Sequence, residues 1–104
     1  MSTEKNKWID AVGKLITLTQ ERKLLWHSTD SYDNYQTEYG GKVLRLHWSY
    51  QDDEKFIRLA LMDPQTGVEW AFPPSALNEH LMEAVRYQLV GVGEFLDELL
   101  THAV

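Results

Sequence analysis

The sequence predicts an α+β domain: an antiparallel β-meander of about four strands, flanked by an N-terminal and a long C-terminal amphipathic helix. Apolar residues recur at helical spacing near both ends of the chain and alternate with polar residues in its middle. These are the patterns of half-buried helices and strands. The chain has 104 residues, 43% of them hydrophobic and 25% charged. This size and composition are typical of one globular domain, which we assign to residues 1–104.

The N-terminal helix is predicted over residues of about 4–21. Its inward-facing positions follow the i, i+4, i+7, i+8 pattern of a helix with one buried face, and they are Trp8, Val12, Leu15, Ile16 and Thr19. The segment 23–28 contains two leucines and Trp26, and it indicates an early strand. The segment 28–34 is rich in turn-forming residues and predicts a loop.

The meander follows, with strands predicted over 35–39, 43–50, 56–62 and 68–72. Gly40-Gly41 separates the first two and is typical of a two-residue hairpin turn. The second strand has the clearest alternation. One of its faces carries Leu44, Leu46, Trp48 and Tyr50, and the other carries Val43, Arg45, His47 and Ser49. A strand that alternates in this way has one face in the core.

The final helix is predicted to begin after Ser75, a good N-cap residue. Its apolar positions keep one helical phase throughout, and they are Leu77, Leu81, Val85, Leu89, Val92, Leu96 and Leu99. Gly91 and Gly93 interrupt this stripe, and each costs a helix about 1 kcal/mol relative to alanine. The glycines could divide the segment into two helices. Because the apolar phase continues across both of them, we favour the alternative of one long helix that bends there.

The charge and composition exclude several classes of function. The formal net charge of −6 disfavours general binding to nucleic-acid phosphates. The absence of cysteine excludes disulfides, thiolate catalysis and cysteine-based zinc sites. No segment approaches the ~20 apolar residues that span a bilayer. We therefore expect a cytoplasmic protein that binds neither membranes nor nucleic acid.

The polar face of the second strand is one candidate site. Arg45, His47 and Ser49 project together from it, and Arg58 and Glu69 lie on the strands that follow. Two arginines beside a histidine suit a carboxylate or phosphate ligand. The alternative interpretation is a solvated sheet face stabilised by cross-strand pairs.

Other polar residues give no reactive site. His80 and Glu83 have the i, i+3 spacing of metal ligands, but no second such pair accompanies them. The run Asp52-Asp53-Glu54 lies in a predicted turn. Neither a nucleophile motif nor a phosphate-binding glycine loop occurs. We therefore assign no catalytic residue, metal ligand or cofactor, and we expect that the protein is not an enzyme.

The end of the final helix is the second candidate surface. Its apolar residues are Phe95, Leu96, Leu99 and Leu100, and its acidic residues are Glu94, Asp97 and Glu98. The apolar surface is wide for a helix covered by one thin sheet. A partner chain would cover the remainder; the alternative is complete burial within the monomer.

Several segments together resemble a group of small uncharacterised bacterial proteins. The resemblance covers nearly the whole chain and is carried by residues 15–20 (LITLTQ), 23–26 (KLLW), 70–73 (WAFP), 84–88 (AVRYQ) and 95–100 (FLDELL). Arg22 stands where glycine would be expected at the helix end, and Gly91-Val92-Gly93 stands where the group is more acidic. The resemblance implies an α+β fold and supplies no activity.

Three hypotheses about function follow. The leading one is a non-enzymatic protein–protein interaction module that self-associates through the final helix. The second is an acidic inhibitor or immunity-type protein that masks a basic surface on its partner, because residues 27–104 carry a charge of −8. The third is a small-molecule binder that uses Arg45, His47 and Arg58, which requires those side chains to line a concave pocket.

Overall fold

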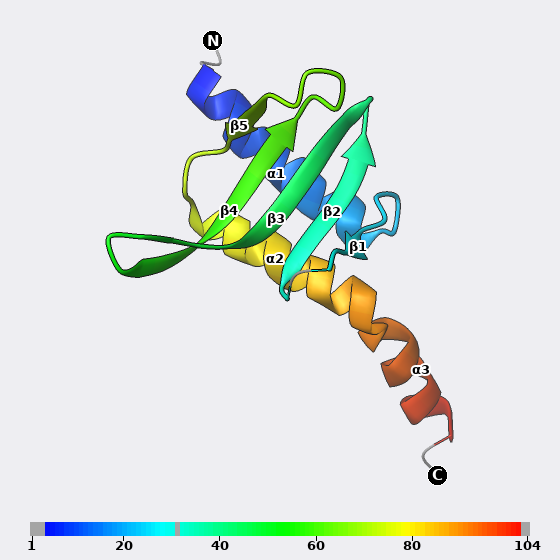
Figure 1. Cartoon of the computed structure of the whole chain (residues 1–104). Helices are drawn as coiled ribbons and strands as arrows, with labels where there is room; N and C mark the ends of the chain where they lie inside the picture. Colours follow the sequence, from blue (N-terminus) through cyan, green and yellow to red (C-terminus); the bar gives the residue numbers. More distant parts are fainter. Residues whose placement is uncertain (1–3, 31, 103–104) are drawn as a thin grey trace.

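The fold is α+β, as predicted. The computed structural model describes residues 4–30 and 32–102 (Figure 1). Its elements, in chain order, are α1 (Glu4–Gln20), β1 (His27–Ser28), β2 (Asn34–Tyr39), β3 (Lys42–Gln51), β4 (Glu54–Met62), β5 (Glu69–Ala71), α2 (Ala76–Val90) and α3 (Val92–His102). The strands form one antiparallel sheet in the order β1-β2-β3-β4-β5, so each strand pairs with its neighbour in the sequence.

Two tight hairpins set the register of the central strands. Gly40 and Gly41 connect β2 to β3 with φ of 61° and 77°, and Asp52 and Asp53 connect β3 to β4 with φ of 52° and 66°. Two successive residues with positive φ match the twist of the flanking strands. The β3–β4 ladder extends from the Val43–Met62 pair to the Gln51–Glu54 pair, and it forms a long hairpin that projects from the sheet (Figure 1).

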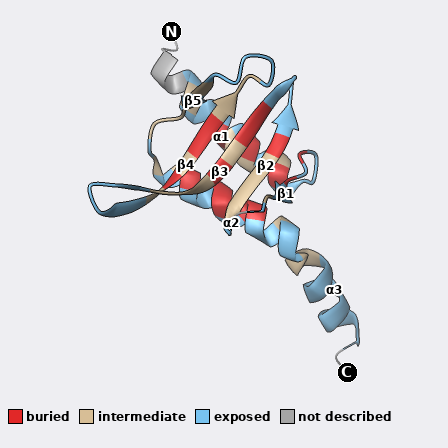
Figure 2. Ribbon diagram, in the orientation of Figure 1, coloured by how far each residue is buried: buried red, intermediate tan, exposed pale blue. Residues whose placement is uncertain are grey.

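The hydrophobic core lies on one side of this sheet, under α1 and α2 (Figure 2). It contains residues from both helices, from the α1–β1 connection and from the inner faces of β3 and β4: Val12, Leu15, Leu24, Trp26, Leu44, Leu46, Ile57, Leu59, Leu81, Met82 and Val85. No helix of the described residues covers the opposite face, which is the outer face of the sheet (Figure 1). The alternation in β3 therefore predicted the inner and outer faces correctly.

The early strand predicted over 23–28 is shorter than expected, because only His27–Ser28 pairs with β2. The backbone before this pair forms hydrogen bonds with the side chain of Gln88 in α2 instead. The Gln88 side-chain oxygen accepts a hydrogen bond from the Trp26 amide at 2.8 Å, and its Nε2 donates to the carbonyls of Thr19 and Leu24 at 3.0 and 2.9 Å. The Trp26 indole donates to the Thr19 hydroxyl at 2.9 Å. We call these contacts the Gln88 clamp.

The prediction of one continuous final helix is wrong. As expected, Ser75 caps α2, accepting a hydrogen bond from the Leu77 amide at 3.1 Å. However, α2 ends at Val90, where Gly91 adopts a left-handed conformation with φ of 77°. The Gly91 amide bonds back to α2, and its carbonyl accepts from the Phe95 amide of α3. One left-handed residue redirects the chain while helix resumes immediately, so the apolar phase of the sequence conceals the break.

Helix α3 extends away from the sheet and its two covering helices (Figure 1). The molecule measures 51 × 36 × 29 Å and has a Cα radius of gyration of 15.4 Å. A compact domain of this length has a radius of gyration of about 13 Å, so the molecule is more extended than a compact domain. None of the described residues of α3 is buried. Among the residues that the structure describes, no helix has the length and apolar character needed to cross a bilayer.

Candidate functional site

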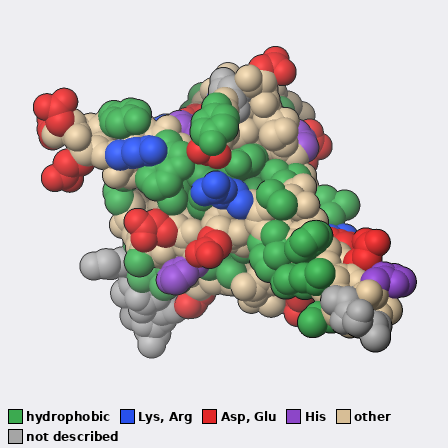
Figure 3. Space-filling model, turned by 90° about the horizontal axis from the view of Figure 1, so that it is seen from below, with side chains coloured by type: hydrophobic (Ala, Val, Ile, Leu, Met, Phe, Trp, Pro, Cys, Tyr) green, Lys and Arg blue, Asp and Glu red, His purple; other side chains and the backbone are tan. Residues whose placement is uncertain are grey.

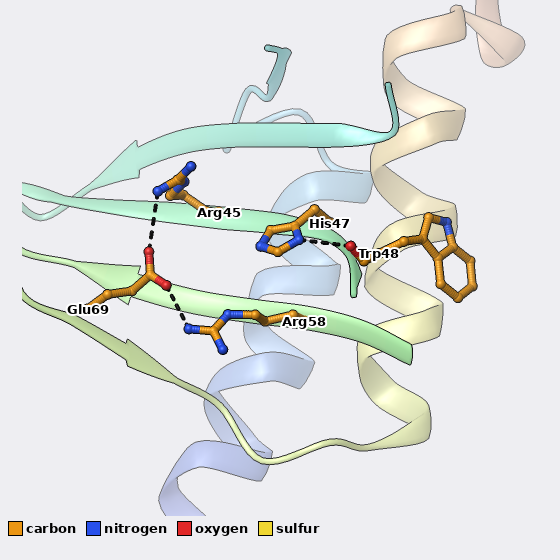
Figure 4. Close-up of polar contacts among 5 residues, drawn as sticks. All are labelled: Arg45, His47, Trp48, Arg58 and Glu69. Atoms are coloured by element: carbon orange, nitrogen blue, oxygen red, sulfur yellow. Dashed lines mark hydrogen bonds and ion pairs between the residues drawn. The ribbon is translucent and has the colours of Figure 1, made fainter. Parts of the chain in front are cut away.

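The polar face of β3 lies on the outer face of the sheet, and its two arginines converge on one carboxylate (Figure 4). Arg58 Nη2 lies 2.7 Å from Glu69 Oε1, and Arg45 Nη1 lies 3.4 Å from Glu69 Oε2. The three residues come from β4, β5 and β3. Glu69 therefore links the arginines of the two central strands to an edge strand, in the cross-strand arrangement that stabilises sheets.

This arrangement changes the acidity of Glu69. The hydrogen bond from Arg58 lowers the pKa of the Glu69 carboxyl from its ordinary value of 4.5, whereas partial burial acts in the opposite direction. The charges of Arg58, Arg45 and His47 lower the pKa further. Glu69 is thus held as a carboxylate at neutral pH, and it offsets part of the positive charge that an anionic ligand would use.

The other two predicted residues of this face do not extend the network. Nδ1 of His47 lies 3.0 Å from the carbonyl oxygen of Trp48. Ser49 is half-buried opposite Phe56 on β4. The arrangement favours the interpretation of a sheet face stabilised by ion pairs, because both arginines expected to bind a ligand already contact a carboxylate of the same chain.

His80 and Glu83 line a groove of about 550 Å³ between the C-terminal end of α1 and helices α2 and α3. Arg22 and Glu94 form an ion pair in this groove, which connects the end of α1 to the first turn of α3. In the described part of the chain, no three histidine or acidic side chains come together as metal ligands would. We call this space the helix groove.

The candidate surface on α3 is exposed to solvent. The exposed fractions are 63% for Phe95, 41% for Leu96, 48% for Leu99 and 79% for Leu100. Gly93, Glu94 and Asp97 face the helix groove, whereas Phe95 and Leu99 lie beside Glu98 in a separate shallow depression. Figure 3 shows hydrophobic side chains gathered at this end of the molecule, next to acidic ones. The alternative of complete burial within the monomer is wrong.

A second groove, of about 590 Å³, lies between the base of the β3–β4 hairpin and α2. Its apolar lining consists of Trp48, Ile57, Met82, Tyr87, Val90 and Val92, and its charged residues are Glu79, Glu83 and Arg86. Lys55 stands over the Trp48 ring, with its Nζ 4.3 Å from the ring centroid. We call this the hairpin groove. Because Val92 belongs to both the groove and α3, the apolar lining continues onto the exposed face of α3.

Sequence reasoning did not identify the hairpin groove or the Gln88 clamp. The clamp joins residues more than 60 positions apart, and no periodicity reveals such a contact. One signal was available for the groove: Arg86 is the only lysine or arginine after residue 58. A single cation within an otherwise acidic, amphipathic segment indicates a position with a particular electrostatic role.

Comparisons of this chain with protein-family models, with curated proteins and with solved structures find no match. Its own geometry is therefore the basis for a functional proposal.

Proposed function

We propose that this protein is a non-enzymatic protein–protein interaction module that self-associates through α3. The observation that carries this proposal is that α3 is amphipathic, lies outside the body of the domain and has no buried residue among those described. Val90, at the end of α2, adds to the same surface with an exposed fraction of 76%. Monomeric proteins rarely expose contiguous apolar patches of this kind without a partner for them.

The low stability expected of an isolated α3 supports the same proposal. A helix of 11 residues is marginal in water when it does not pack against another element. The described contacts that hold it are the bonds at Gly91 and the ion pair between Arg22 and Glu94. The exposed ion pair contributes at most about 1 kcal/mol. A partner that covers the apolar face would therefore stabilise α3 as well as bind it.

The apolar contribution to such a dimer is substantial. Complete burial of one large apolar side chain contributes about 1.5–3 kcal/mol, and the four on α3 are roughly half exposed. Covering them on both copies contributes roughly 10 kcal/mol. Association itself costs about 4–15 kcal/mol. Contacts between the α3 helices alone thus give a weak dimer, and a stable one requires a larger surface.

Sedimentation equilibrium of the full chain tests the proposal. The wild type should dimerise in the high-micromolar to millimolar range expected of a weak dimer, and Leu99→Glu should be monomeric there with an unchanged circular dichroism spectrum. Val68→Glu is the matched control, because Val68 is 69% exposed in the β4–β5 turn, which is not part of either groove. A wild type that remains monomeric throughout this range would contradict the proposal.

Salt dependence separates this proposal from the acidic-inhibitor hypothesis. Association through apolar side chains should persist when surface charges are screened by high salt. An acidic inhibitor should instead bind a basic partner and lose that binding as salt is added. Self-association that persists from low to high salt in the sedimentation experiment therefore supports the interaction module, whereas salt-sensitive binding to an added basic protein would support the acidic inhibitor.

A further inference from the structure

The hairpin groove and α3 have complementary chemistry. The groove is lined by apolar side chains, and two cations lie at it: Arg86 on α2 and Lys55 over Trp48. Neither cation forms an ion pair with any carboxylate in the described part of the chain. Helix α3 has an apolar face bordered by Glu98 and contains neither lysine nor arginine. The lining also contains Glu79 and Glu83, so Arg86 and Lys55 are the two positions at which the groove offers positive charge to α3.

Charge also argues against direct pairing of two α3 helices. Glu98 lies beside Phe95 and Leu99 on the apolar face of α3, so two α3 helices packed only against each other through this face would bring like charges to their interface. Like charges at an interface cost binding energy, and complementary charges determine its register. Placing α3 in the groove brings Glu98 to Arg86 instead.

We propose that α3 of a second copy occupies the hairpin groove, with Glu98 of the docked helix paired with Arg86 of the receiving chain. This inference rests on the proposed function and specifies its contact surface. The docked helix packs Phe95 and Leu99 against Trp48 and Val90 of the other copy. This is the recognition of an amphipathic helix by an apolar groove.

The arrangement is reciprocal. Val92 lies at once in the groove and at the start of α3, so two copies related by a twofold axis can each place α3 in the other's groove. In a twofold interface the same patch serves both copies. Figure 3 shows hydrophobic side chains on this face and at the α3 end of the molecule, with basic and acidic side chains among them. Glu79 and Glu83 also line the groove, so Arg86 is the residue of its lining that can pair with a carboxylate of the docked helix.

Charge reversal tests the contact. Arg86 and Glu98 are both exposed, so Arg86→Glu and Glu98→Arg should fold normally, as circular dichroism will verify. Each variant alone should weaken self-association about tenfold or more, because each places like charges at the contact. An equimolar mixture of the two should form heterodimers at near wild-type affinity. Native mass spectrometry distinguishes heterodimers from homodimers by mass. Lys14→Glu is the control, because it changes the net charge as Arg86→Glu does, at an exposed position of α1 outside both grooves.

The outcomes separate this inference from the proposed function. Restored association in the mixture, with Lys14→Glu unaffected, supports the docked arrangement. A wild-type dimer that neither charge reversal weakens overturns the inference and leaves self-association through α3 standing. A monomeric wild type overturns both, and a different protein would then be the occupant of the groove.

Discussion

The Gln88 clamp is expected to hold the end of α2, from which α3 extends, against the α1–β1 connection. Replacing Gln88 with alanine removes the acceptor for the Trp26 amide and both donors to the carbonyls of Thr19 and Leu24. Each hydrogen bond contributes about 1 kcal/mol net. Because Gln88 is only half-buried, water can reach part of the vacated space. We expect Gln88→Ala to lower the free energy of unfolding by about 2–3 kcal/mol.

Urea denaturation followed by tryptophan fluorescence measures this loss, since Trp26 is 4% exposed and reports directly on the clamp. For a domain of this size, the loss corresponds to a fall in Tm of roughly 10–20 °C. Gln20→Ala is the matched control, because Gln20 is exposed on the last turn of α1 and should change stability by less than about 0.5 kcal/mol. Measurement below the dimerisation range separates folding from association. If Gln88→Ala lowers the free energy of unfolding no more than Gln20→Ala does, the clamp does not stabilise the α1–β1 connection.

Four further predictions concern single positions. Gly91→Ala should cost about 1 kcal/mol in urea denaturation, because alanine disfavours the left-handed conformation with φ of 77°. Gly93→Ala should be neutral or stabilising by up to about 1 kcal/mol, because an added Cβ would meet the Tyr87 ring at an ordinary 3.7 Å and favour the helix. Arg22 also has a positive φ, a conformation that glycine adopts more easily than alanine. Both Arg22→Gly and Arg22→Ala lose the ion pair to α3. The free energy of unfolding should therefore be about 1 kcal/mol higher for Arg22→Gly than for Arg22→Ala. Because folding lowers the pKa of Glu69, its ionised carboxylate contributes to the free energy of unfolding. This contribution is fully present above the ordinary pKa of 4.5 and is lost as pH falls through the lower pKa of the folded protein. Glu69→Gln should therefore cost about 1 kcal/mol at neutral pH and much less in acid, as chemical denaturation across pH will measure.

Three of these positions lie at the base of α3. Gly91 redirects the chain, Arg22 ties the first turn of α3 to α1, and Gln88 anchors the last turn of α2. All three act at the base of α3 and are not in the contact surface proposed for the dimer. Variants at these positions should therefore change self-association through the direction of α3, whereas changes at Leu99 or Arg86 should alter it through contact.

The meander could be predicted from the sequence because its information is local. Alternation with period two assigned Leu44 and Leu46 to the core and Arg45 and His47 to the outer face, and Gly40-Gly41 marked the hairpin. The N-terminal helix followed from its apolar spacing, and the apolar stripe of α3 was visible in the sequence, which left open whether that stripe is exposed or buried within the monomer. Side-chain direction repeats at short intervals along a strand or helix, so a pattern within a few residues is sufficient.

Tertiary structure decided what depends on contacts between distant residues. Gly91 and Gly93 are alike in the sequence, yet only Gly91 breaks the helix, because its amide bonds back to α2 in a left-handed conformation. The two arginines of the outer face meet Glu69 of another strand, which turns an expected ligand site into an internal ion-pair network. The apolar spacing of the sequence predicted that the final segment is amphipathic. Its projection away from the core depends on the break at Gly91, and the position of that break is determined by three-dimensional packing.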